Sequence, residues 1–149
     1  NYSEILVYTK SSLVEQTTPA IGDLNDTVAL VSDIYYAGKD LDRLELGGTI
    51  TWSPPTCDGC AIVDFYDVYL AENAYGLRRS QLGLNIPVGT NSLDILPETQ
   101  EQSFTHFNIY TRSYMAEQTT PKAIAIDDTV SLAFNISFVD EDLDVGEVG

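Results

Sequence analysis

The sequence predicts an all-β protein in which a seven-stranded antiparallel β-sandwich recurs in a tandem array. Three features support this prediction: short apolar segments alternate with polar residues at a period of two, turn residues separate these segments, and a stretch near the N-terminus returns near the C-terminus. Such alternation marks strands with one buried face. Several short strands with turn signals between them indicate a sandwich.

The internal repeat sets the domain organisation. Residues 8–19 read YTKSSLVEQTTP, and residues 110–121 read YTRSYMAEQTTP. At this offset of 102 positions, 18 of the 47 aligned pairs are identical without a gap, where chance gives about 3. A period of about 100 residues is too long for a solenoid and is typical of a whole immunoglobulin-like sandwich.

The repeat divides the chain into three parts. We expect residues 1–24 to be the C-terminal strands of one unit, residues 25–126 to form a complete unit, and residues 127–149 to begin the next. Two or three strands bury too little apolar area to be stable alone. The flanking parts therefore need more chain or a partner molecule, and we expect the natural protein to be longer.

The first strand of the complete unit is expected to bury Val28, Leu30, Ile34 and Tyr36, and its counterpart at 130–138 reads VSLAFNISF. The other expected strands are 49–52, 62–71, 82–88, 93–95, 107–111 and 123–126. The inward positions are Tyr66, Val68 and Leu70; Leu82, Leu84, Ile86 and Val88; Leu93 and Ile95; and Phe107, Ile109 and Thr111.

Prolines are expected to end two of these strands, because proline cannot donate to a strand ladder. Pro54 follows the second strand and Pro97 follows the fifth.

A tryptophan at residue 52, the Pro-Pro that follows it and the Tyr-x-Val-x-Leu of residues 66–70 resemble a fibronectin type III domain. The resemblance covers nearly all of residues 25–126. In the family a tyrosine corner comes shortly after Leu-x-Pro, whereas here Leu96-Pro97 is followed by a longer stretch containing Phe104 and Phe107. Related immunoglobulin-like and cadherin-like topologies therefore stay open.

The net charge of −16, from 23 acidic and 7 basic residues, disfavours two classes of partner. Phosphate backbones repel such a surface, and so do anionic membranes. No apolar run approaches the ~18 residues that span a bilayer. We therefore expect no nucleic-acid binding and no membrane span in this segment.

The sequence predicts no enzyme activity. His106 is the single histidine, and the chain has no Gly-x-Ser-x-Gly elbow. It also lacks a His-Glu-x-x-His zinc motif, a phosphate-binding glycine loop and a dinucleotide fingerprint. We expect His106 to be an outward-facing strand residue.

Cysteines and sequons favour an extracellular or cell-surface glycoprotein. Cys57 and Cys60 lie between expected strands, whereas redox pairs of this spacing sit at a helix start and a zinc site needs a second ligand pair. A local disulfide is the better interpretation, and it suits an oxidising compartment. Asn-x-Ser/Thr sequons at Asn1, Asn25 and Asn135 are candidate glycosylation sites.

Two acidic loops recur at the repeat offset and leave two interpretations open. Each is either a solvated loop between strands or a calcium site, since calcium prefers six to eight oxygen ligands from such clusters. The candidate ligands are Asp40, Asp42 and Glu45 in one loop and Asp140, Asp142 and Asp144 in the other. No other cofactor is expected.

An aromatic contact patch is expected on the outer face of two neighbouring strands. If the alternation holds, side chains between the inward positions point outward and form an exposed surface, which often marks a contact region. The candidate residues are Phe65, Tyr69, His106 and Tyr110, with Arg78 and Arg79 available to meet an acidic loop of a neighbour.

These features predict a structural array outside cells that acts as a stalk, spacer or filament through self-association or contacts with other extracellular proteins. The alternative is an adhesive or receptor-like module that binds a protein or a glycan. A third possibility is a passive spacer in a secreted enzyme whose catalytic domain lies elsewhere.

Overall fold

The computed structural model describes residues 3–24, 28–128, 130–137, 139 and 145. It confirms an all-β protein of antiparallel sheets, and the described residues contain no α-helix. The elements are β1 (Glu4–Val7), β2 (Ala20–Asp23), β3 (Ser32–Gly38), β4 (Glu45–Ser53), the 3₁₀ turn η1 (Cys60–Ile62), β5 (Phe65–Ala71), β6 (Ser80–Pro87), β7 (Ser92–Gln100), β8 (His106–Arg112) and β9 (Lys122–Ala125).

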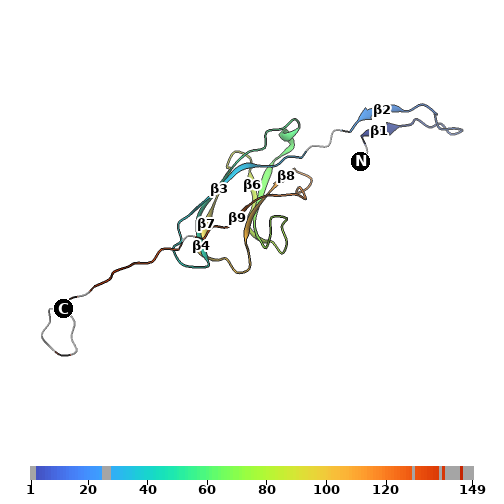
Figure 1. The fold of residues 1–149 in the computed structure, drawn as a ribbon. Helices are drawn as coiled ribbons and strands as arrows, with labels where there is room; N and C mark the ends of the chain where they lie inside the picture. The colour runs from blue at the N-terminus through green and yellow to red at the C-terminus, as the bar shows by residue number, and fades with distance from the viewer. Residues whose placement is uncertain (1–2, 25–27, 129, 138, 140–144, 146–149) are drawn as a thin grey trace.

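Strands β3 to β9 form the body of the molecule (Figure 1). They make one sheet in the order β3-β4-β7 and another in the order β6-β5-β8-β9. Side chains from both sheets share one buried apolar cluster. Within it, Trp52 meets Tyr66 edge to face at 5.3 Å between ring centroids, and Tyr36 meets Phe107 at 4.7 Å, geometries that add to the gain from burial.

The start of the first strand faces the opposite way from the predicted pattern. Ala29 and Val31 are buried, whereas Val28 is exposed. The pairing of β3 with β4 contains one extra residue between Ser32 and Tyr35, and Asp33 there has φ 48°. This bulge reverses the phase of the alternation, so the inward positions resume correctly at Ile34 and Tyr36.

The predictions for β6 and β7 are also wrong where the pairing of these strands is irregular. Leu84 is exposed while Ile86 is buried, because β6 has register shifts against β5 and Asn85, between these two residues, has φ 56°. Val88 is also exposed, and it lies one residue beyond the end of β6. Strand β7 does not end at Pro97 but continues to Gln100. The extra residues there interrupt its pairing with β4, and such irregular positions are where strands accommodate proline.

The hairpin β1–β2 repeats the geometry of β8–β9. Glu4 pairs with Asp23 and Val7 with Ala20, just as His106 pairs with Ala125 and Ile109 with Lys122. Every one of these positions differs by 102 residues from its counterpart. The turns also agree: the bridge Lys10–Glu15 corresponds to Arg112–Glu117, and the hydrogen bond from Ser11 N to Val14 O corresponds to that from Ser113 N to Ala116 O.

The two hairpins differ in what covers them. Ile5 and Val7 of β1 are 53% and 58% exposed, whereas their counterparts Phe107 and Ile109 in β8 are 0% and 1% exposed. The second hairpin lies in the body, while the first extends away from it (Figure 1). The body strands are therefore what covers the apolar face of this kind of hairpin.

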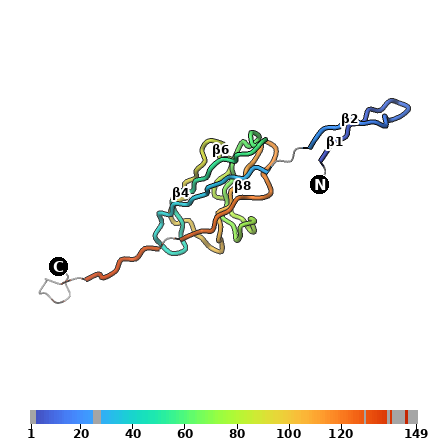
Figure 2. Tube along the Cα trace, turned by 45° about the horizontal axis from the view of Figure 1, so that its top comes forward, coloured from blue at the N-terminus to red at the C-terminus, as the bar shows by residue number. Residues whose placement is uncertain are grey.

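The segment after β9 leaves the body at the opposite side from the N-terminal hairpin (Figure 2). The predicted strand at 130–138 is not formed by residues 130–137, which are exposed; residue 138 lies outside the described residues. The backbone nevertheless repeats a detail of β3, because Asn135 has φ 55° and its counterpart Asp33 has φ 48°.

The strand registers define two ends of the body. Residues 28–31, 54–64 and 113–121 gather at what we call the first end, because Phe65 pairs with Arg112 and Ser32 with Ser53. Residues 39–44, 72–79 and 101–105 gather at the second end, from which the chain continues towards the C-terminus.

Candidate functional site

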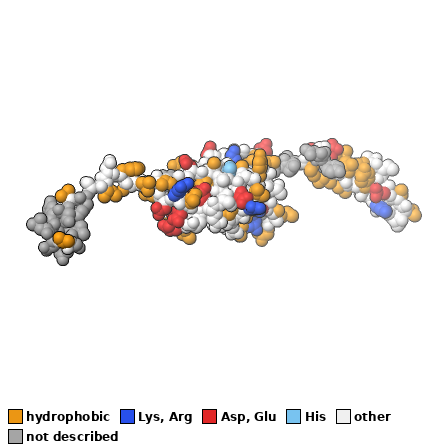
Figure 3. All heavy atoms as spheres, turned by 60° about the horizontal axis from the view of Figure 1, so that its bottom comes forward, with side chains coloured by type: hydrophobic (Ala, Val, Ile, Leu, Met, Phe, Trp, Pro, Cys, Tyr) orange, Lys and Arg blue, Asp and Glu red, His pale blue; other side chains and the backbone are white. Residues whose placement is uncertain are grey.

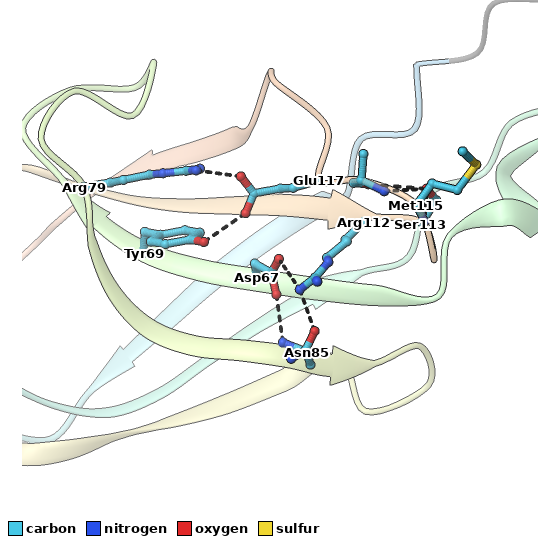
Figure 4. Close-up of polar contacts among 9 residues, drawn as sticks. Asp67, Tyr69, Arg79, Asn85, Arg112, Ser113, Met115 and Glu117 are labelled. Atoms are coloured by element: carbon cyan, nitrogen blue, oxygen red, sulfur yellow. Dashed lines mark hydrogen bonds and ion pairs between the residues drawn. The ribbon is translucent and has the colours of Figure 1, made fainter.

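The outer face of the β6-β5-β8-β9 sheet carries a compact group that we call the Glu117 cluster. Glu117 accepts a hydrogen bond from the Tyr69 hydroxyl at 2.9 Å and pairs with the Arg79 guanidinium at 2.7 Å. Arg79 lies over the rings of Tyr69 and Tyr110, 4.3 and 4.4 Å from their centroids. Figure 4 shows the Glu117 carboxylate facing both Arg79 and the Tyr69 hydroxyl. Burial and the Glu117 carboxylate raise the pKa of Tyr69 to about 12.

A second polar group lies beside it on the same sheet (Figure 4). The carboxylate of Asp67 is 1% exposed, accepts a hydrogen bond from Asn85 N–H at 2.8 Å and lies 3.5 Å from the Arg112 guanidinium. Arg112 also donates to Asn85 Oδ1 at 2.6 Å. Burial raises the pKa of Asp67, although these donors act in the opposite direction. A buried carboxylate needs such partners, and Asp67 thereby fixes the bulge of β6.

The exposed aromatic patch predicted for this face is not present as expected. Tyr110 is 3% exposed, because the loop between β5 and β6 covers it. Gly76 in that loop has φ 84°, and a side chain there would overlap the Tyr110 hydroxyl. Arg79, expected to meet a neighbouring molecule, pairs instead with Glu117 of its own unit.

The other predicted patch residues lie apart from the Glu117 cluster. Phe65 pairs with Arg112 at one end of β5, and His106 pairs with Ala71 at the other. Both are partly buried. The His106 Nδ1 atom lies 2.8 Å from Thr105 Oγ1, and Arg78 pairs with Glu72 at 3.4 Å.

Two residues of the repeated motif, Thr111 and Gln118, bind the first residues of the body through hydrogen bonds. Thr111 Oγ1 donates to Ala29 O at 2.7 Å, and Ala29 N donates to Gln118 Oε1 at 3.2 Å. The equivalent pair Thr9 and Gln16 is hydrogen-bonded in the first hairpin at 2.6 Å. The repeated stretch is thus used for architecture: Glu117 holds the outer face and Gln118 holds the incoming strand. Sequence reasoning missed both residues, although their recurrence at residues 15 and 16 was a signal.

The predicted acidic loop gains a fourth member. One carboxylate oxygen from each of Asp40, Asp42, Glu45 and Glu98 lies within 4.8 Å of the others. The hydrogen bond and the negative charge of Glu45 raise the pKa of Glu98, whereas N–H donors of Glu98 and Asp42 lower the pKa of Asp40.

Acidic side chains gather on the body at the side of the C-terminal segment (Figure 3). A hollow of about 430 Å³ on β4 and β7 adjoins Asp40 and Glu98. These oxygen donors fit the chemistry of calcium, and a calcium site here stays a prediction. Asp140, Asp142 and Asp144 lie outside the described residues.

The predicted disulfide is present. Cys57 and Cys60 are bonded at the first end of the body, with a Cα–Cα distance of 5.2 Å, and the turn η1 starts at Cys60. Of the three sequons, Asn135 is exposed, while Asn1 and Asn25 lie outside the described residues.

Comparisons with known proteins do not assign a family. No family model matches the chain, and neither a curated protein nor a solved structure matches it significantly. Within the part of the chain that the structure describes, no helix is long and apolar enough to cross a membrane.

Proposed function

We propose that this chain is part of a structural array of β-sandwich units outside cells, each unit resembling a fibronectin type III domain. Seven strands in antiparallel sheets of three and four fit a seven-stranded sandwich. The units proposed are residues 25–126 with parts of a unit on either side.

One observation carries the proposal: β1–β2 and β8–β9 have the same pairing and the same turn hydrogen bonds 102 residues apart. The apolar face that is buried in the second hairpin is exposed in the first. Because strands of a body cover that face in the second case, an equivalent set of strands is the natural cover for the first. A chain made of such units serves to span distance.

The extracellular location is supported by the Cys57–Cys60 disulfide, since disulfides persist in oxidising compartments. Asn135 within its sequon is accessible to a glycosyltransferase. Treatment of the natural protein with a glycosidase, followed by mass measurement, tests this part of the proposal: an unchanged mass and free thiols at both cysteines argue for a cytosolic protein.

Imaging of the intact natural protein by negative-stain electron microscopy tests the array itself. A nine-residue strand such as β4 spans about 30 Å, so we expect beaded rods with an axial repeat on the order of 30–40 Å. Compact particles without a regular repeat would contradict the proposal.

The alternative of an adhesive module has weaker support, because the aromatic face expected to bind a partner is occupied by Arg79 and Glu117 of the same chain. Glycan-array and pull-down binding that Tyr69→Ala abolishes while the array still assembles would favour this alternative.

A further inference from the structure

Both hairpin turns present an apolar side chain to solvent at the same place. Met115 in the turn of β8–β9 is 95% exposed, and its counterpart Leu13 in the turn of β1–β2 is 93% exposed. The hydroxyl of Ser113 accepts hydrogen bonds from Met115 N and Ala116 N, as Ser11 does in the first turn. Met115 points away from the Glu117 cluster (Figure 4). A firmly held turn that twice exposes a large apolar residue is a candidate contact surface.

The opposite end of the body presents a second apolar surface, on the loop between β3 and β4. Leu41 and Leu44 in this loop are about half exposed. The chain that leaves the body is bound to the same loop: Leu44 N donates to Asp128 Oδ2 at 2.8 Å, and Ser131 N donates to Leu41 O at 3.2 Å. The path towards the next unit therefore starts on this loop.

One residue position brings the two surfaces together. Ser131 is the counterpart of Ala29 at the offset of 102. Ala29 is held by Thr111 and Gln118 at the base of the hairpin turn of its own unit. Ser131 is hydrogen-bonded to Leu41 of the unit before it. In an array of equivalent units, the residue at this position touches the β3–β4 loop of one unit and the base of the hairpin turn of the next, so these two surfaces are neighbours.

We propose that consecutive units pack end to end, with the hairpin turn of one unit, residues 113–116, seated on Leu41 and Leu44 of the unit before it. The partner is thus another copy of the same unit, and the inference rests on the proposed array. A hollow of about 220 Å³ adjoins the turn and gives room for a leucine side chain; its lining combines Ala29, Ile62 and Ala116 with the polar residues Thr111, Ser113, Glu117 and Gln118. The two surfaces that meet in such a head-to-tail contact are different, so the contact can repeat along an open array without closing into a ring.

A disulfide cross-link in a tandem chain tests the contact. The chain joins residues 1–126 directly to residues 25–149, which keeps the register because residue 127 is the counterpart of residue 25. No described cysteine is free, so Leu44→Cys in the first copy and Met115→Cys in the second supply the only pair of free thiols. We expect most molecules to form this intramolecular disulfide under mild oxidation, seen by peptide mapping of the monomer fraction.

The matched control carries the same two substitutions in the opposite copies, Met115→Cys in the first and Leu44→Cys in the second. These residues then lie at the far ends, and we expect no intramolecular cross-link. Equal cross-linking in both chains, or none in the forward chain, would overturn the proposed contact. Fluorescence of Trp52 in both chains verifies that the units are folded.

A second measurement uses the 149-residue chain as it stands. Equimolar Leu44→Cys and Met115→Cys chains are oxidised together at high concentration, where random collision gives twice as much mixed dimer as either homodimer. We expect an excess of the mixed dimer of at least severalfold, and the statistical ratio would contradict the contact. If neither cross-link forms but electron microscopy shows regular beaded rods, the proposed junction is wrong and the proposed array stands. Compact particles in the microscope would contradict the array itself.

Discussion

Replacement of Glu117 by alanine is the most informative perturbation of the outer face. It removes the acceptor of the Tyr69 hydroxyl and the partner of Arg79. A hydrogen bond to a charged group contributes about 1.5–3 kcal/mol, and a partly exposed ion pair at most about 1 kcal/mol. Loss of the repulsion between Glu117 and Asp67, which helps to raise the pKa of Asp67, offsets part of this. We expect the free energy of unfolding to fall by about 2 kcal/mol.

Denaturant unfolding followed by fluorescence measures this change, since Trp52 is the single tryptophan and lies in the core. Glu117→Gln separates the two contributions, because the amide keeps an acceptor and loses the charge. Glu15→Ala is the matched control: it makes the same change in the same motif, where no hydrogen bond or ion pair of the carboxylate is seen among the described residues. We expect less than about 0.5 kcal/mol there. Equal effects of the alanine substitutions at residues 117 and 15 would refute the role of the cluster.

Three further outcomes are expected. The Tyr69 phenol, followed by NMR with labelled tyrosine, titrates near pH 12, and it titrates at lower pH in Glu117→Gln. Because its pKa in the folded state lies above the unfolded value of about 10, the free energy of unfolding falls as the pH rises from 10 to 12. A Tyr69 titration at pH 10 in the unchanged protein would contradict the buried geometry. Gly76→Ala destabilises the protein more than Gly89→Ala, since both glycines have positive φ but only the first side chain would meet another residue; equal unfolding midpoints would count against this. Reduction of the disulfide lowers the free energy of unfolding by at most about 2 kcal/mol, because its loop is short, and a larger loss in the same denaturation assay would show a wider role.

Alternation in the sequence predicted the strands of the body, but it did not predict the phase of each strand, and the strand expected at 130–138 is not formed by residues 130–137. Alternation located the inward faces of β5 and β8 correctly, with Tyr66, Val68 and Phe107 fully buried. It failed around Asp33 and Asn85, because an inserted bulge residue reverses the alternation without changing its appearance. The residue types were the available signal, since Asp and Asn tolerate the left-handed conformation that both adopt.

The outer face could not be predicted from periodicity at all. An outward position is normally solvated, whereas Tyr110 is buried because it packs against Tyr69 and lies under the loop between β5 and β6. Gly76 in that loop leaves room for the Tyr110 hydroxyl. Glu117 reaches Tyr69 across 48 positions. Such pairings depend on how sheets and loops fold back, which no local pattern encodes; the recurrence of Glu-Gln at the repeat offset was the one hint.

Small-angle scattering of the tandem chain, compared with the 149-residue chain, measures most directly whether equivalent units follow one another end to end. One added unit contributes about 30–40 Å along its strands. A maximum dimension that grows by this amount, with a sharply defined distance distribution, is the predicted result. Growth well below the length of a unit, or a broad distribution typical of freely jointed units, would contradict it.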